Sequence, residues 1–162
     1  MNKYKVIDNF INKNTFNQLK EIITGKKFPW FYESVINSKH SELDKTLYFV
    51  HIAYEYNSNS SFYEDLRNIF WNKLKIKSLI RIKINCYPRT EKLHVNEKHI
   101  DYDFKHKAAV FSINTNDGGT FISNNKIDSI ENRIVLFDGN KPHSSSTCTN
   151  QKARFNINFN YF

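Results

Sequence analysis

The sequence predicts a mainly β (α+β) fold, a double-stranded β-helix or jelly roll with supporting N-terminal helices. Two segments with helical periodicity lie in the first half of the chain, several short segments with strand periodicity follow, and turn signals separate those strands. This order is typical of a two-sheet β fold that helices cover on one side. The 162 residues fit one domain, with a helical and strand N-terminal part at 1–78 and a jelly-roll core at 79–162.

The first elements are short. The apolar stretch from Val6 to Ile11 is expected to form a strand or an entry turn. A helix should follow from an N-cap at Thr15 to about Thr24, because apolar side chains recur on one stripe and Gly25 comes next. Three further segments are an extended aromatic segment at 28–32, a polar loop over a site at 34–46 and a strand at 47–54.

A second helix is expected to begin near Ser61, because Glu64 three residues later completes a capping-box pattern. Its apolar face consists of Phe62, Leu66, Ile69, Phe70 and Leu74. The period then changes to two, and Ile80, Ile82 and Ile84 alternate with polar side chains, as in a half-buried strand. Further strands are predicted at 107–114, 119–123, 133–137, 143–148 and 153–162, with turns at 116–119 and 138–139.

The net charge of +8 raises the question of a nucleic-acid partner. Of the 24 basic residues, 19 are lysines, and Asn and Ile are also abundant. An AT-rich coding sequence would produce this composition without any phosphate contacts. Since no block of five or more basic residues occurs, the ordinary explanation is preferred and a nucleic-acid-binding face stays an alternative.

The remaining composition indicates a cytoplasmic protein. No apolar run approaches the roughly 20 residues of a membrane span, and the polar start from Met1 to Asp8 is unlike a signal peptide. The two cysteines, Cys86 and Cys148, are too few for a disulfide scaffold and lie in no C-x-x-C motif.

Two histidines and one carboxylate form a candidate metal site. His99 and Asp101 are two residues apart, so on a strand their side chains would point the same way. His143 follows a hydrophobic strand and a turn, and is expected at the start of the next strand, across the barrel. This is the ligand set of non-haem Fe(II) oxygenases, which leaves one face of the metal open. Ordinary loop and turn histidines are the alternative.

The last segment alternates between polar and apolar residues. One face carries Arg154, Asn156, Asn158 and Asn160, and the other carries Phe155, Ile157, Phe159 and Tyr161. Because Asn is a poor strand residue, the polar face either meets solvent or lines a barrel interior that holds a dicarboxylate. Arginine suits the second role because its planar fork can bind a carboxylate at two points.

These residues, from about Leu79 to Phe162, resemble the prolyl-4-hydroxylase-like branch of the 2-oxoglutarate/Fe(II)-dependent oxygenase superfamily, whose fold is a cupin-like jelly roll. The segments at 6–10 and 28–30 also look like the corresponding segments of small phage-type members. The resemblance implies that His99, Asp101 and His143 bind iron. It also implies that Arg154 pairs with the distal carboxylate of 2-oxoglutarate.

The resemblance implies the cofactors Fe(II), 2-oxoglutarate and O2, with ascorbate as a stimulant. The reaction would hydroxylate a substrate C–H bond and release succinate and CO2. A prolyl or other peptidyl side chain is the first expectation for the substrate, in the host cytoplasm if the protein is phage-encoded. The two alternatives are an oxygenase acting on an alkylated base in nucleic acid and a non-catalytic barrel that binds an anion or a metal.

Further pocket residues follow from the same resemblance. Tyr87, in Cys86-Tyr87-Pro88, matches a family tyrosine that points into the co-substrate pocket, and Asn158 matches a hydrogen-bonding position. Asn114, with the turn at 118–120, resembles the family's strand–turn–strand. Ser112 stands where many members have a tyrosine, so that contact is lost or made through water.

The substrate would lie over the open metal face. The loops at 34–46 and 88–98 are expected to border it, and His94 and Trp30 are candidates for its mouth, with packing as the alternative. The base-demethylating relatives carry Arg-x-Asn-x-x-x-Arg on the last strand. This chain has Asn160 in the last place, which disfavours that branch.

Overall fold

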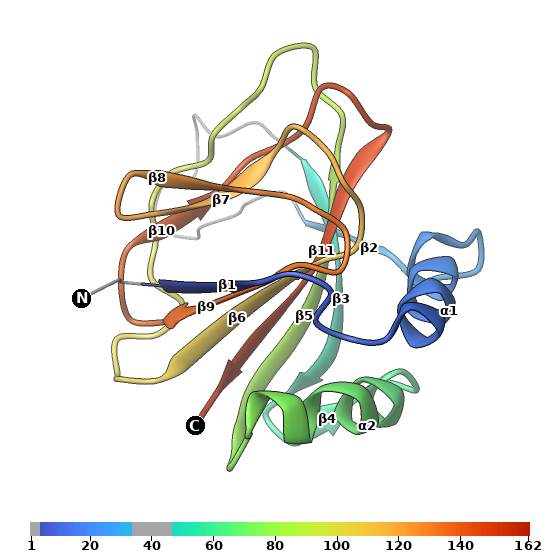
Figure 1. Ribbon diagram of the computed structural model, residues 1–162, viewed down its shortest axis with the longest axis vertical. Coiled ribbons are helices and arrows are strands. Elements are labelled where there is room, and N and C mark those ends of the chain that lie inside the picture. The colour runs from blue at the N-terminus through green and yellow to red at the C-terminus, as the bar shows by residue number, and fades with distance from the viewer. Residues whose placement is uncertain (1–3, 34–46) are drawn as a thin grey trace.

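The computed structural model describes residues 4–33 and 47–162, and it has the predicted jelly-roll architecture (Figure 1). In spatial order, the main sheet consists of β1 (Tyr4–Ile7), β9 (Ile134–Asp138), β6 (Lys107–Ser112), β11 (Ala153–Tyr161), β5 (Leu79–Pro88), β3 (Tyr48–Glu55) and β2 (Phe31–Glu33), with β4 (Ser58–Asn59) paired to β3. The smaller sheet consists of β10 (His143–Ser145), β7 (Gly119–Ile122) and β8 (Asn125–Asp128).

The outer face of the main sheet is apolar because two helices cover it. Helices α1 (Lys13–Thr24) and α2 (Tyr63–Leu74) lie on the side away from β7, β8 and β10 (Figure 1). Phe16 of α1 and Phe70 of α2 pack with Phe111 of β6 and Phe159 of β11 in one buried cluster. Truncating a fully buried phenylalanine such as Phe70 to alanine typically costs about 3–5 kcal/mol, so this layer supplies much of the stability.

The space between the two sheets is only partly apolar. At one side, Val110, Val135 and Phe137 of the main sheet pack against Ile122 and Ile127 of the smaller sheet. Along β5 and β11, by contrast, the inward residues are polar, and the register places Arg154 opposite Tyr87 and Asn158 opposite Lys83. The jelly roll therefore encloses a polar interior next to a small apolar core.

Both predicted helices are present, but both predicted N-caps were wrong. Helix α1 begins at Lys13, because the side chain of Asn12 accepts a hydrogen bond from the Thr15 backbone N–H, which makes Asn12 the cap. Helix α2 begins at Tyr63, and its cap residue Phe62 makes no capping side-chain bond. The capping box predicted at Ser61 is therefore absent.

The predicted strands in the C-terminal half are confirmed with shifts of a few residues at their ends. The short strands β4 and β8 were not predicted, because segments of two and four residues are too short to show a hydrophobic alternation. The loop predicted at 34–46 lies outside the described residues. Neither described helix is long and apolar enough to cross a membrane.

Asn132 joins the N-terminal segment to the barrel. It is buried in the turn between β8 and β9, with a left-handed backbone at φ 59°. Its side chain accepts from the backbone N–H of Ile11 at 3.0 Å and donates to the backbone carbonyl of Ile11 at 2.8 Å. The segment that leads from β1 into α1 is thereby fixed to a turn more than a hundred residues away.

Asn132→Ala should lower the free energy of unfolding by about 2–4 kcal/mol, because it leaves two buried backbone groups of Ile11 without partners. Urea denaturation would measure the change. Asn9→Ala is the matched control, since Asn9 also has a left-handed backbone, at φ 51°, but is exposed. It should cost roughly 1 kcal/mol or less. Equal losses in the two variants would show that the side-chain bonds of Asn132 contribute nothing.

Candidate metal centre

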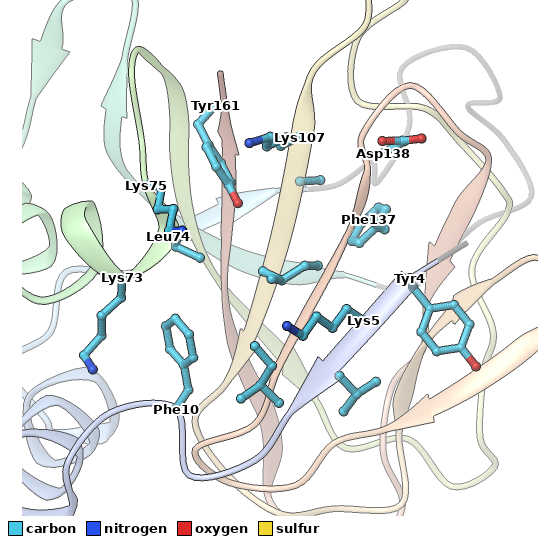
Figure 2. Close-up of a pocket in the computed structure, with 14 residues that line it drawn as sticks. Tyr4, Lys5, Phe10, Lys73, Leu74, Lys75, Lys107, Phe137, Asp138 and Tyr161 are labelled. Atoms are coloured by element: carbon cyan, nitrogen blue, oxygen red, sulfur yellow. The ribbon is translucent and has the colours of Figure 1, made fainter. Parts of the chain in front are cut away.

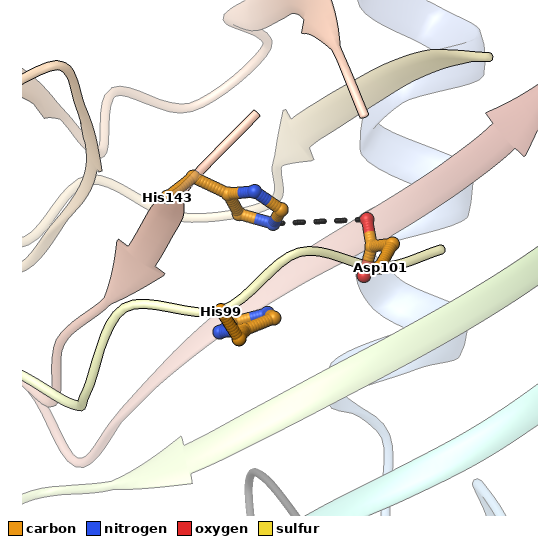
Figure 3. A group of neighbouring side chains, drawn as sticks. All are labelled: His99, Asp101 and His143. Carbon is orange, nitrogen blue, oxygen red and sulfur yellow. Dashed lines mark ion pairs between the residues drawn. The ribbon is translucent and has the colours of Figure 1, made fainter. Parts of the chain in front are cut away.

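The two histidines and the aspartate predicted from the sequence lie together. One ligand atom each from His99, Asp101 and His143 all fall within 4.8 Å of one another. Figure 3 shows the three side chains converging, with His143 Nε2 3.7 Å from Asp101 Oδ2 and the ring centroids of the two histidines 4.6 Å apart. Two imidazoles and a carboxylate at this spacing can bind a divalent metal ion on one side.

A backbone bridge brings the histidines together. His99 and His143 exchange two backbone hydrogen bonds, each 2.9 Å long, although 44 residues separate them. His143 begins β10, as predicted. The prediction that His99 and Asp101 share a strand was wrong, because they lie in an irregular segment whose single bridge is the one at His99. Asp101 is fixed separately, through its N–H bond to the Gly139 carbonyl at 3.3 Å.

The protonation states of the triad suit a metal. His143 Nδ1 lies 2.9 Å from the Lys141 carbonyl and donates to it, so Nε2 is the nitrogen that faces Asp101. Burial and the neighbouring His143 lower the pKa of His99 to about 4. Burial alone would raise the pKa of Asp101, but His143 and Arg81 outweigh it and bring this pKa to about 2. At neutral pH, His99 is therefore neutral and the carboxylate of Asp101 is ionised.

Asp101 is held by two side chains of the main sheet. Arg81 Nη2 donates to Asp101 Oδ1 at 2.9 Å, and Asn160 Nδ2 donates to Asp101 Oδ2 at 2.8 Å. The Asp101 side chain is only 4% exposed, so both bonds form away from bulk solvent. A carboxylate ligand oriented in this way loses little rotational freedom when a metal binds.

Asn160 contacts the candidate metal ligand Asp101, and the sequence did not indicate this contact. Its carbonyl accepts from Arg81 at 3.1 Å, and its amide lies 3.2 Å from His106 Nε2. His106 Nδ1 donates to the Phe104 carbonyl, so its Nε2 is an acceptor and the Asn160 amide is the donor. Asn160 is fully buried, and both of its amide hydrogens and its oxygen have partners. Its position on the polar face of the last strand was the available signal.

The polar cavity between the sheets contains His99, His143 and, in the same lining, Arg154. Arg154 is 1% exposed and donates to the Ser129 hydroxyl, the Ser146 carbonyl and the Thr120 hydroxyl. Its guanidinium lies 5.3 Å from the centre of the Tyr87 ring. Among residues 4–33 and 47–162, no carboxylate pairs with it. Burial lowers the pKa of the Arg154 guanidinium, because a buried charge without a partner of opposite charge is unfavourable.

Tyr87 and Asn158, predicted as pocket residues, also line this cavity. The Tyr87 ring stacks on Tyr48, and burial raises the pKa of its hydroxyl, which therefore stays protonated. Within the described part of the chain, the side-chain oxygens of Asn158 and Asn85 are buried without a hydrogen-bond partner. Unsatisfied buried polar groups are rare in native proteins, and they indicate that this space receives a polar ligand or water.

Two predicted pocket residues lie outside the lining. Asn114 donates to the Ala153 carbonyl and accepts from the Phe155 N–H, so its amide extends the pairing of β11 beyond the end of β6. Ser112 is buried opposite Asn156 but does not border the cavity. The two candidates for the mouth also lie elsewhere: Trp30 packs against Phe28 in the outer cluster, and His94 is not among the lining residues.

A larger hollow, of about 1010 Å³, lies on another part of the surface, between β1, β6, β9 and the end of α2 (Figure 2). Four lysines border it, namely Lys5, Lys73, Lys75 and Lys107, and Asp138 is the one acid among its lining residues. It has no histidine or cysteine in that lining. Its size alone does not make it a reaction site, whereas the smaller cavity combines candidate metal ligands with a buried cation.

Comparisons with known proteins support the fold. No family model matches the sequence, and no curated protein matches it. A prolyl hydroxylase from Trichoplax adhaerens, in complex with a hypoxia-inducible-factor peptide, superposes with a TM-score of 0.74 at 16% identity, covering 100% of this chain and 84% of that one. At identities this low, the similarity establishes a shared fold.

Two other solved structures agree. A prolyl-4-hydroxylase from Pseudomonas putida gives a TM-score of 0.62 at 11% identity, over 98% of this chain and 92% of that one. A viral collagen prolyl hydroxylase from Paramecium bursaria chlorella virus 1, in complex with 2-oxoglutarate, gives 0.56 at 14% identity, over 98% of this chain and 94% of that one. The jelly roll is thus a fold that this chain shares with solved prolyl hydroxylases.

Asn160→Ala should weaken binding of a divalent metal ion about 10- to 100-fold, because Asp101 loses the donor that orients it. Calorimetric titration with Ni(II) would measure the affinity. The matched control is Asn156→Ala, on the same face of β11, whose side chain pairs with Asn85 and not with Asp101. An unchanged affinity in the Asn160 variant, or an equal loss in both, would remove the positioning role from Asn160.

Proposed function

We propose that this chain is an Fe(II)- and 2-oxoglutarate-dependent oxygenase that hydroxylates a substrate C–H bond and releases succinate and CO2. One observation carries the proposal: a fully buried arginine without a carboxylate partner in the described residues lines the same cavity as two of the three clustered metal-ligand candidates. A metal site alone would be compatible with many functions. A metal site beside an uncompensated buried cation calls for a ligand that bears a negative charge and reaches the metal.

His99, Asp101 and His143 would hold the iron. The donor set fits Fe(II), since two imidazoles and one ionised carboxylate leave the opposite side of the ion free for other ligands. When bound, the iron and the keto acid supply the oxidising chemistry that no protein side chain provides. The residues of this chain position the ligands, satisfy the charge of Asp101 through Arg81 and Asn160, and exclude water.

Arg154 would bind the distal carboxylate of 2-oxoglutarate. Its three observed bonds fix the guanidinium plane and use three of its five N–H donors, so two donors remain for a carboxylate. Gly118 permits this placement, because a Cβ there would lie 2.9 Å from Arg154 Cδ and would clash with the Thr147 carbonyl oxygen. The Tyr87 hydroxyl and the Asn158 amide line the same space and would complete the pocket.

For the substrate, we propose a prolyl or other peptidyl side chain. The support is the fold shared with prolyl hydroxylases, one of which was solved with a bound peptide. The alkylated-base alternative receives less support, because Asn160 stands in place of the second arginine of that branch and is fully occupied with Asp101, Arg81 and His106. Mass spectrometry of proline-containing peptides after reaction, searching for the gain of one oxygen atom, would test the substrate class.

The first test of the function is anaerobic titration of the apo-protein with Fe(II) and 2-oxoglutarate. The iron–keto-acid chelate expected of this ligand set should give a weak absorption band in the visible range. His99→Ala and His143→Ala should each abolish the band and iron-dependent succinate formation. His94→Ala, whose side chain is outside the cavity lining, should keep both. The proposal fails if the intact protein gives no band or if either triad variant turns over fully.

Arg154→Ala should raise the 2-oxoglutarate concentration needed for half-maximal succinate formation by about 10- to 100-fold, because a charge-assisted, bidentate contact is lost. Metal affinity should stay within a few-fold of the intact protein, since Arg154 has no contact with the triad in the described structure. Arg133→Ala, which removes a surface ion pair with Asp8, is the control and should leave both constants unchanged. An unchanged 2-oxoglutarate requirement in the Arg154 variant would exclude the assigned role.

A further inference from the structure

A second cation lines the inter-sheet cavity. Lys83 lies on the inner face of β5, between Arg81 and Asn85, and the register places it opposite Asn158 of β11. It borders the same cavity as His99, His143 and Arg154. In the sequence, Lys83 is one of the polar residues of an alternating strand. No feature of the sequence distinguishes Lys83 from lysines that face solvent.

The ammonium group of Lys83 has no anionic partner in the described residues. It makes no hydrogen bond or ion pair there, and its contact is with the Tyr48 ring, 5.8 Å from the ring centre. The described lining of the cavity includes two cations, Lys83 and Arg154, and no carboxylate. Burial, with Arg81 nearby, lowers the pKa of Lys83 to about 8, although the charges of Asp101, Glu33 and Glu55 act in the opposite direction without contacting the ammonium group. A half-buried cation in this state is unfavourable unless an anion arrives.

The two cations stand at different ends of the cavity. Arg154 is opposite Tyr87, and Lys83 is four residues from Tyr87 along β5, which corresponds to roughly 13 Å of strand. The Lys83 end is the end of the metal ligands, because the next inward pair along the two strands is Arg81 and Asn160, the residues that hold Asp101. One cation is therefore far from the triad and the other is beside it.

We infer that Lys83 is a second anion-binding group, which binds the carboxylate at the metal-chelating end of the keto acid while Arg154 binds the distal carboxylate. This inference rests on the proposed function and assigns one cation to each end of a dicarboxylate ligand. The ammonium of Lys83 balances the carboxylate next to the keto group, and the guanidinium of Arg154 selects the length of the diacid. A monocarboxylic keto acid would then satisfy Lys83 alone.

The test compares two ligands on three proteins, by calorimetric titration of the Ni(II)-loaded forms, in which no turnover occurs. The ligands are 2-oxoglutarate and 2-oxopentanoate, which has the same carbon chain without the distal carboxylate. Lys83→Met should weaken both ligands by about 10- to 100-fold. Arg154→Met should weaken 2-oxoglutarate by a similar factor and leave 2-oxopentanoate unchanged, so the two variants separate the two ends of the ligand.

Two controls keep the result interpretable. Lys83→Arg retains the charge and should bind both keto acids within a few-fold of the intact protein. Lys107→Met, at the hollow outside the cavity, should change neither affinity. The melting temperature of ligand-free Lys83→Met should not fall, because methionine keeps an apolar side chain of similar length and removes a half-buried charge that has no ion-pair partner in the described residues.

The possible failures are distinguishable. If the intact protein binds neither keto acid, the proposed function fails and the role of Lys83 fails with it. If the intact protein binds both and Lys83→Met binds them equally well, the role of Lys83 alone is excluded. A loss confined to 2-oxoglutarate in Lys83→Met would place this lysine at the distal carboxylate and overturn the assignment.

Discussion

The structure depends on a polar strand face buried at the centre of the main sheet. Strand β11 lies between β5 and β6, so its inward residues, from Arg154 to Asn160, cannot reach bulk solvent. Each buried polar group costs free energy unless it finds a partner. The opposite face of β11 is apolar and packs under the helices, which fixes the orientation of the strand. A shift by one residue would bury the polar row against the helices and expose the phenylalanines.

The partners of this polar row come from segments far away in the chain, and they build the site. Asn160 meets Asp101, Asn156 meets Asn85, and Arg154 meets the hydroxyl of Ser129. The backbone bridge between His99 and His143 then closes the cavity from the other side. Hydrogen bonds that satisfy the buried polar side chains of β11 thus also position the metal-ligand candidates. Stability and the geometry of the site are linked through Asn160. Its own buried amide needs hydrogen-bond partners, and one of these partners is Asp101, which the bond orients.

The sequence predicted the features that depend on local spacing, and it did not predict those that depend on pairing across the sheet. The jelly roll is confirmed, and the clustering of His99, Asp101 and His143 followed from motif order and turn signals. The predicted N-cap of α1 was wrong because Asn12 and Thr15 are only three residues apart and both are good caps. The sequence did not indicate a role for Asn160 or Lys83. Strand pairing decides that Asn160 contacts Asp101 and that Lys83 has no ion-pair partner in the described residues, and this pairing cannot be read from local spacing. The sequence could not reveal that Asn114 bonds the backbone of β11, because an amide that bonds a neighbouring backbone has the same sequence signal as one that bonds a ligand.

The charged side chains around the cavity indicate how the binding of a metal and the binding of a keto acid would affect each other. Arg81 is paired with Asp101 and with Glu55, whereas the two lining cations, Lys83 and Arg154, have no carboxylate partner in the described residues. A divalent cation adds two further positive charges near Lys83 and Arg154, so these two cations repel it. A dicarboxylate brings two negative charges and removes most of that repulsion. Each ligand should therefore raise the affinity of the other, since linkage makes such coupling reciprocal. In this cavity the electrostatic cost of the two lining cations is lowest when metal and diacid are bound together.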